Sequence, residues 1–120
     1  MKYIQKEDYL AATGINLDIE FKNVATDNPS SAVNIFLQNQ ENMVLEYMQN
    51  FDVDLDKLDP EVMKKVMIYQ VEWVLRNGDL SNDSDYLGMP ISKKGYNLLR
   101  LNGYANLKTD GSRSYRERFN

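Results

Sequence analysis

The segment from Pro60 to Asn77 most constrains the fold of this 120-residue chain. Wound into a helix, it is apolar around most of its circumference, and its charged residues form one narrow strip. A helix with so little polar surface has to be enclosed by neighbours, either within its own fold or in an assembly. We therefore expect a helix at 60–77 in the middle of the fold. Its apolar residues are Val62, Met63, Val66, Met67, Ile68, Tyr69, Val71, Trp73, Val74 and Leu75.

Four aspartates within eight residues precede this helix: Asp52, Asp54, Asp56 and Asp59. Their spacing resembles the start of a calcium-binding loop. Such a loop needs Gly at position 6 and Glu at position 12, where this chain has Lys57 and Met63. An N-cap at Asp59, followed by Pro60 and Glu61, instead favours a helix start. The acidic run is thus interpreted as a helix entrance and no metal site is expected.

Gln70 is the one uncharged polar side chain on the apolar side of that helix, near Val66 and Trp73. Burying its amide without a hydrogen-bond partner would cost roughly a few kcal/mol. We predict that Gln70 forms structural hydrogen bonds.

Three further helices are predicted from periodicity and capping residues. A long amphipathic helix spans about 31–50 behind an N-cap at Asn28 or Ser30, and short helices span 5–13 and 93–101. Residues 15–27 fit either an alternating pattern or a helical face, so both remain open. The fold class is therefore all-α, a bundle of about four helices, two long and two short. The predicted core, with Trp73 central, is Phe36, Leu37, Val44, Tyr47, Val66, Tyr69, Trp73, Val74 and Leu99.

Composition narrows the functional classes. The chain is long enough for one domain with one core, and it contains neither Cys nor His. Disulfides, Cys or His zinc ligands and nucleophiles paired with His are therefore excluded. No cofactor and no catalytic residue is predicted. No apolar run has the length of a signal or membrane segment, so we expect a soluble protein inside the cell.

Charge is distributed unevenly. Residues 1–103 hold ten Lys or Arg against sixteen Asp or Glu, whereas residues 104–120 hold four against two. We expect a helical domain at 1–103 and a basic, flexible tail at 104–120. Arginines interleaved with aromatic residues are typical of interface anchors. The predicted partner-binding residues are Tyr104, Arg113, Tyr115, Arg116, Arg118 and Phe119.

Two stretches, LDPEVMKKVMIYQVEWVLRNGDLSND and MPISKKGYNLLRLNGY, are similar to a known family. They resemble the head-tail connector proteins of long-tailed bacteriophages, also called adaptor or head-completion proteins. The shared features are a Gln-Val-Glu on a buried helix that ends in Asn-Gly-Asp, a polar loop, and a short Ser-capped helix. The opening KYIQKEDYLAATGI also resembles the family's start, whereas residues 16–34 do not align.

The resemblance implies an all-helical adaptor of the virion, assembled in the host cytoplasm. Many copies form a ring between the portal protein and the stopper or tail-completion protein, and DNA passes through the ring without specific binding. No catalysis is implied. The C-terminal segment of such proteins reaches the portal or neighbouring subunits, which agrees with the independent interpretation of residues 104–120. Like charge along a DNA channel avoids sticking to phosphates, and the candidate channel-facing acids are Asp79, Asp83 and Asp85.

Two alternatives remain open. The chain could be a generic helical module for protein–protein interaction. It could also be a small DNA-binding regulator in which the helix at 93–101 enters the major groove, with Lys93, Lys94 and Arg100 facing phosphates. Against the second, the 77–92 connection is long for a helix-turn-helix, and the chain is acidic overall.

Overall fold

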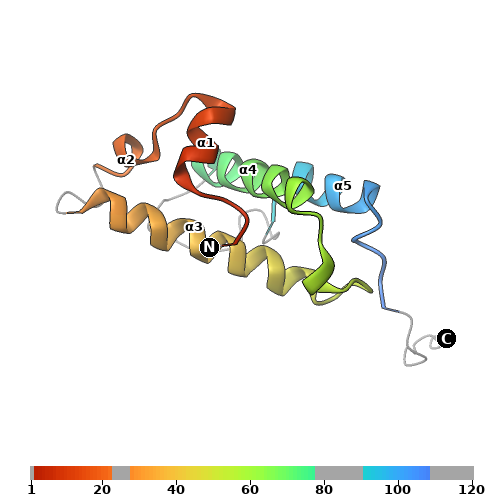
Figure 1. Ribbon diagram of the computed structural model, residues 1–120. Helices are drawn as coiled ribbons and strands as arrows, with labels where there is room; N and C mark the ends of the chain where they lie inside the picture. The colour runs from red at the N-terminus through yellow and green to blue at the C-terminus, as the bar shows by residue number, and fades with distance from the viewer. Residues whose placement is uncertain (1, 23–27, 78–90, 109–120) are drawn as a thin grey trace.

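The computed structural model describes residues 2–22, 28–77 and 91–108, and within these ranges it contains helices and no β-strand (Figure 1). The predicted all-α fold is therefore confirmed. The predicted helix at 60–77 is found with those bounds, as is the one at 93–101. The elements in order are α1 (Lys6–Thr13), α2 (Leu17–Glu20), α3 (Pro29–Met48), the 3-10 turn η1 (Leu55–Lys57), α4 (Pro60–Asn77) and α5 (Lys93–Leu101).

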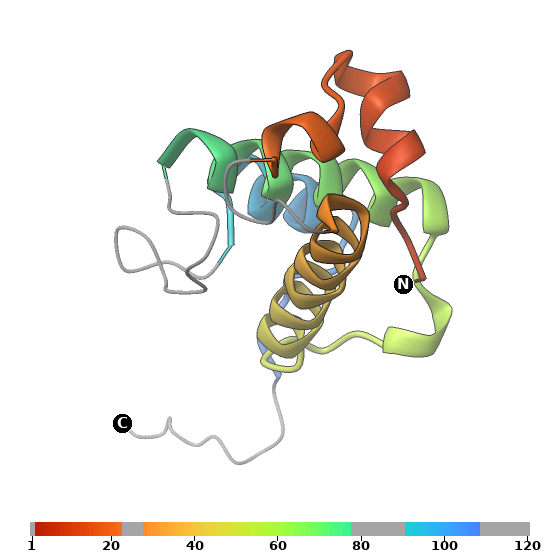
Figure 2. The same ribbon diagram turned by 90° about the vertical axis from the view of Figure 1, so that its left-hand side faces the viewer.

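Helix α4 occupies the middle of the bundle. It packs against α3 and α5, and in both views it lies between the α1–α2 segment and α5 (Figure 1, Figure 2). Every apolar side chain of α4 is buried or partly buried. The enclosure expected from its sequence is thus found within a single chain.

The acidic run before α4 starts the helix, as predicted. The Asp59 carboxylate accepts a hydrogen bond from the Glu61 amide at 2.9 Å, which satisfies one of the unpaired amides of the first turn. Asp54 does the same for η1, accepting from the amide of Asp56 at 2.9 Å. Within the described ranges, no cluster of three or more acidic residues could hold a metal ion.

The core differs from the prediction at three aromatic residues. Tyr47, Tyr69 and Trp73 are only partly buried and pack against the core from its edge. The expectation that Trp73 is central is wrong, because its side chain reaches the surface. Met63 and Met67 are the fully buried large side chains of α4 instead. The other six predicted core residues are buried: Phe36, Leu37, Val44, Val66, Val74 and Leu99.

Residues 15–22, which the sequence left open, form one short helical turn. Leu17 and Phe21, four residues apart, are buried, whereas Ile15 and Ile19 are exposed. Phe21 contacts Phe36 of α3 with ring centroids 5.2 Å apart. The helical alternative is therefore correct for this part, and residues 23–27 lie outside the described residues.

Helix α5 crosses α4 closely at Gly95. A Cβ atom placed on Gly95 would lie 2.9 Å from the Ser92 hydroxyl and 3.4 Å from a methyl group of Val66. A larger residue would displace the Ser92 hydroxyl that caps α5 and would leave little room against Val66 of α4. The glycine that weakens α5 as an isolated helix thus permits its packing.

A buried hydrogen-bond chain joins the three helices of the centre. The Gln70 side-chain amide donates to Gln40 Oε1 at 2.9 Å, and Gln70 Oε1 accepts from the backbone amide of Ser92 at 2.8 Å. The Ser92 hydroxyl in turn caps α5 by accepting from the Gly95 amide. Both glutamines are almost fully buried. The structural role predicted for Gln70 is confirmed.

The chain continues along the body after α5. The Tyr104 hydroxyl accepts from the Asp59 amide at 3.0 Å, and the Asp52 amide donates to the Asn106 carbonyl at 2.6 Å. Phe51 and Leu107 form an isolated antiparallel bridge. The folded body therefore extends to Leu107, four residues beyond the boundary expected after Gly103.

Candidate functional site

An open cavity of about 150 Å³ lies between the C-terminal half of α4 and the start of α5. Tyr69 and Trp73 supply aromatic walls, and Lys93 and Lys94 supply positive charge at its edge. The Lys94 ammonium group lies 5.8 Å from the centre of the Tyr69 ring. Glu72 and Arg76, which also line it, pair with each other at 3.4 Å. The cavity thus combines an aromatic wall with a cationic edge.

The outer face of α5 continues this positive charge. Lys93, Lys94 and Arg100 are all exposed, and Lys93 and Arg100 are seven residues apart, which places them on one side of the helix. Residues 91–108 contain four Lys or Arg and no acidic residue. Among the residues that the structure describes, none of the three has an acidic partner within ion-pair distance. We call Lys93, Lys94 and Arg100 the basic face.

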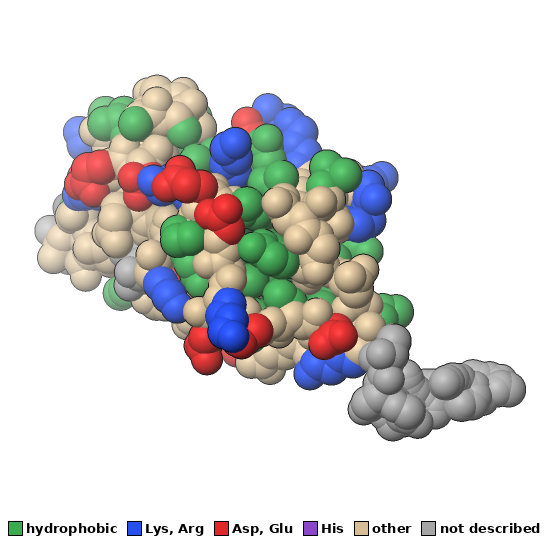
Figure 3. All heavy atoms as spheres, turned by 45° about the vertical axis from the view of Figure 1, so that its right-hand side comes forward, with side chains coloured by type: hydrophobic (Ala, Val, Ile, Leu, Met, Phe, Trp, Pro, Cys, Tyr) green, Lys and Arg blue, Asp and Glu red, His purple; other side chains and the backbone are tan. Residues whose placement is uncertain are grey.

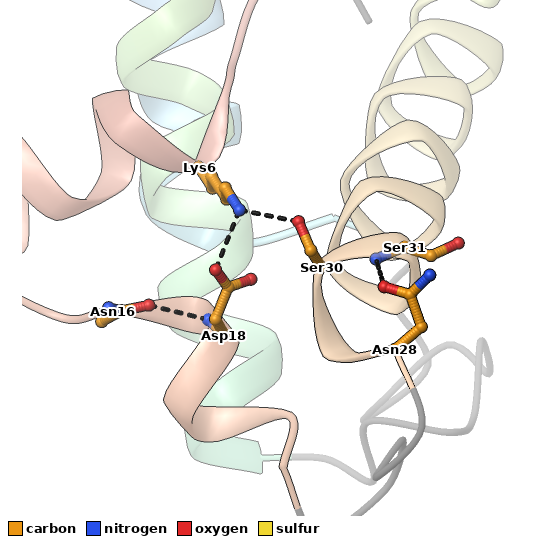
Figure 4. Close-up of polar contacts among 6 residues, drawn as sticks. All are labelled: Lys6, Asn16, Asp18, Asn28, Ser30 and Ser31. Carbon is orange, nitrogen blue, oxygen red and sulfur yellow. Dashed lines mark hydrogen bonds and ion pairs between the residues drawn. The ribbon is translucent and has the colours of Figure 1, made fainter.

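The α1–α2 segment has the opposite charge. Residues 6–20 contain four acids and one lysine, and we call this segment the acidic end. The lysine, Lys6, is held internally: its ammonium group bonds the Asp18 carboxylate at 2.8 Å and the Ser30 hydroxyl at 2.7 Å (Figure 4). That contact ties α1, α2 and α3 together. Glu7 and Glu20 are exposed and form no ion pair with described residues.

The helix starts beside Lys6 explain why Ser30 is available for this contact. Asn28, the other N-cap candidate, caps α3 by accepting from the Ser31 amide at 3.1 Å, and Asn16 caps α2 by accepting from Asp18 at 2.9 Å (Figure 4). The Ser30 hydroxyl is therefore free to accept from Lys6.

Exposed large apolar side chains concentrate at the two ends of the body. Leu10, Ile15 and Ile19 lie on the acidic end, and Leu101 and Leu107 lie where the described chain finishes. Hydrophobic side chains reach the surface near the last described residues and also in the middle of the face shown in Figure 3. Grouped exposed apolar residues mark surfaces that bind partners, whereas single ones are ordinary.

Glu41, a carboxylate that is 1% exposed in the middle of α3, was not predicted from the sequence. It accepts three backbone hydrogen bonds from the N-terminal segment, from the amides of Lys2, Tyr3 and Ile4 at 2.9, 2.9 and 3.0 Å. The carboxylate thereby holds Tyr3 and Ile4 in the core. Its position on the buried side of α3, in register with Leu37 and Val44, was the available signal.

Tyr9 is a second buried polar residue that was not predicted from the sequence. Its side chain is fully buried, and its hydroxyl has no hydrogen-bond partner among described residues; the Thr13 hydroxyl donates to the Tyr9 carbonyl instead. Burial raises the pKa of the Tyr9 phenol above 10, and the Glu72 carboxylate raises it further.

Tyr9 should therefore make the fold sensitive to alkali. Because its pKa is higher in the folded chain, stability from its neutral form is complete below pH 10 and is lost as pH rises through the folded pKa. Denaturation midpoints measured across this range should fall more steeply for the wild type than for Tyr9→Phe. Equal slopes for the two proteins would contradict this assignment.

Most of the predicted site residues fall outside the described ranges. These are the partner-binding candidates Arg113, Tyr115, Arg116, Arg118 and Phe119, and the channel candidates Asp79, Asp83 and Asp85. Tyr104 is described, and its hydroxyl contributes to the fold through Asp59 while its side chain stays partly exposed. None of the described helices combines the length and apolar character needed to cross a bilayer.

Comparisons of the chain with protein-family models, with curated proteins and with solved structures find no match in any of the three.

Proposed function

We propose that this protein is a bacteriophage head-tail connector. Copies of the chain form a ring between the portal and the stopper or tail-completion protein, and DNA passes through the ring without specific binding. The protein has no catalytic role and resides in the virion after assembly in the host cytoplasm. The proposal starts from the sequence resemblance and is supported by three features of the folded chain.

The first feature is that the two stretches carrying the resemblance form one physical unit. They correspond to α4 and α5, and the glutamine of the Gln-Val-Glu motif bonds the amide of the serine that caps α5. The glutamine of this motif therefore has a structural role, because its contact with Ser92 fixes the start of α5 relative to α4. A shared helix pair of this kind is what a resemblance in these stretches would preserve.

The observation that carries the proposal is the exposure of two large aliphatic residues close to the end of the described chain. Leu101 and Leu107 are 72% and 70% exposed, although both are large aliphatic residues. Arg100 and Lys108 flank them, and the basic aromatic segment 109–120 follows directly. We call Leu101 and Leu107 the apolar patch. Exposed apolar residues followed in sequence by arginines and aromatic residues are typical of a region that binds another protein. We assign it to the portal.

The third feature is the charge of the body. Acidic residues outnumber basic ones in residues 1–103, and an acidic surface repels the phosphates of passing DNA. A channel component benefits from this repulsion, since DNA must move through without being retained.

Substitution of the apolar patch tests the portal contact. We expect Leu101→Ser with Leu107→Ser to weaken binding to the purified portal protein by about tenfold or more, because two exposed anchors lose their apolar contact area. Deletion of 109–120 should abolish binding, and both variants should keep the wild-type melting temperature within a few degrees. Co-sedimentation with portal rings measures the binding.

Ile35→Ser is the matched control for this experiment. Ile35 is 60% exposed on α3, so its substitution removes a similar exposed apolar side chain from a different surface. If the double substitution, the deletion of 109–120 and Ile35→Ser all leave portal binding unchanged, Leu101 and Leu107 do not contact the portal. A wild-type chain that ignores the portal but binds other proteins through the same patch would favour the generic interaction module.

The basic face is the one observation that favours a DNA-binding regulator, because three exposed cations without an acidic partner among the described residues lie on the outer side of α5. However, Gly95 and Leu99 of α5 are buried, so α4 covers the opposite side. Nanomolar, sequence-dependent DNA binding would establish this alternative.

A further inference from the structure

We propose that neighbouring copies of this chain join head to tail, with the acidic end of one copy seated on the basic face and cavity of the next. The inference rests on the ring of the proposed function but uses surfaces separate from the portal patch at Leu101 and Leu107. The group that enters the α4–α5 cavity belongs to a second copy of the chain.

Charge complementarity is the first argument. The basic face presents three exposed cations that have no acidic partner among the described residues, and residues 91–108, to which it belongs, contain no acidic residue. The acidic end presents Glu7 and Glu20, exposed and equally unpaired among described residues. Opposite potentials on two surfaces guide encounter and fix register between subunits.

Apolar complementarity is the second argument. Ile19 is 57% exposed and lies beside Glu20, and Leu10 and Ile15 are exposed on the same segment. A cavity of about 150 Å³ suffices for one benzene-sized group, so it has room for one aliphatic side chain. Ile19 would enter against Tyr69 and Trp73, which places Glu20 near the Lys93 and Lys94 edge. Aromatic and Arg-rich pockets are typical of the energetic centres of interfaces.

The placement of the two surfaces is the third argument. α4 lies between the α1–α2 segment and α5 in both views, so the acidic end and the basic face belong to different elements of one copy (Figure 1, Figure 2). Contacts between two different surfaces are heterologous, and they generate a closed ring when the rotation per subunit closes. A ring adaptor requires contacts of this kind.

DNA is the competing partner for the basic face. Phosphates would use the three cations but leave the aromatic cavity and the exposed Ile19 without a role. A second copy uses the cations, the cavity and the apolar acidic end together. We therefore assign the basic face to a second copy of the chain, and the experiment below also measures DNA binding.

Charge reversal on either side tests the contact in the full-length chain. Lys93→Glu with Lys94→Glu, or Glu7→Lys with Glu20→Lys, each places like charges across the contact. We expect each pair to weaken self-association by at least about a hundredfold, measured by sedimentation at low salt. A mixture of the two variants should assemble again, because every contact between unlike copies is then complementary.

The matched controls separate the contact from general surface effects. Ile19→Ser should weaken self-association, whereas Ile35→Ser, at similar exposure on α3, should not. Lys65→Glu, an exposed charge reversal on α4, should also leave association unchanged. Because the chain contains no Cys, a mixture of Glu20→Cys and Lys93→Cys chains should form a disulfide-linked heterodimer.

The outcomes distinguish this inference from the proposed function. A wild-type chain that stays monomeric both free and on the portal, or a mixture that fails to reassemble, overturns the head-to-tail contact. Portal-bound rings that tolerate both reversals overturn the contact and leave the connector proposal standing. Rings that lose assembly on reversal but never bind portal retain the contact and remove the connector proposal. Loss of DNA binding on Lys93 and Lys94 reversal, with self-association unchanged, assigns the basic face to DNA.

Discussion

Replacing Glu41 with Ala is expected to lower the free energy of unfolding by about 3 kcal/mol or more. The substitution removes the acceptor for three backbone amides, those of Lys2, Tyr3 and Ile4. At least two of these amides are buried, and each unsatisfied donor carries a desolvation cost of about 1–3 kcal/mol. Urea denaturation measures the loss, and hydrogen exchange at Tyr3 and Ile4 should rise far more than elsewhere.

Two variants on the same helix control this result. Glu46→Ala, on the exposed side of α3, should change the free energy of unfolding by less than about 0.5 kcal/mol. Glu41→Gln keeps one acceptor oxygen and should lie between Glu41→Ala and the wild type. A loss below about 1 kcal/mol for Glu41→Ala, with unchanged exchange at Tyr3 and Ile4, would show that the N-terminal segment is held by its apolar side chains alone.

Gln70→Leu is expected to cost about 2–4 kcal/mol, as two buried groups lose their partners at once. The change leaves the Gln40 carbonyl oxygen and the Ser92 amide without the hydrogen bonds that they form at 2.9 and 2.8 Å. Because Ser92 caps α5, we expect α5 to loosen first. Circular dichroism during denaturation and exchange at the Gly95 amide report on the two effects.

A double-mutant cycle isolates the bond between the two glutamines. Gln40→Leu combined with Gln70→Leu removes both partners of the bond between the two glutamines, so the double variant should cost less than the sum of the singles. Gln38→Leu, on the partly exposed side of α3, is the control and should be nearly neutral. Strict additivity would mean that the buried bond between Gln40 and Gln70 contributes nothing to stability.

The helices were predictable because their signals are local. Asp59 and Ser92 cap α4 and α5 as expected, and Gly14 ends α1 in the left-handed conformation that only Gly adopts without strain. The apolar circumference of α4 also identified the centre of the bundle. These features depend on residues within one or two turns of each other, which a single sequence displays directly.

The features that the sequence did not reveal depend on contacts between distant segments. Glu41 accepts hydrogen bonds from amides almost forty positions earlier in the chain. Its register with Leu37 and Val44 indicates that it is buried, but does not identify the amides that satisfy it. Trp73 was predicted to be central because apolar side chains cover α4 almost evenly. The sequence pattern alone does not distinguish the side of α4 that faces α3 from the side that lines the cavity. Tyr69 and Trp73 lie at the edge of the core, where they line the cavity.

The candidate site was only partly accessible from sequence for the same reason. Charge counting found the basic C-terminal segment, but it did not separate α5 from the tail, since Lys93 and Arg100 were counted with the acidic body. The folded chain brings Tyr69 and Trp73 of α4 next to Lys93 and Lys94 of α5. That juxtaposition depends on the Gln70 contact to Ser92, which fixes the start of α5.

Electron microscopy of the full-length chain mixed with a purified portal protein shows whether the proposed ring forms. We expect a ring of identical copies, coaxial with the portal, in which the acidic end of each copy contacts α5 of the next and the Leu101–Leu107 patch faces the portal. Portal rings that remain bare in the presence of excess, folded, wild-type chain would contradict it.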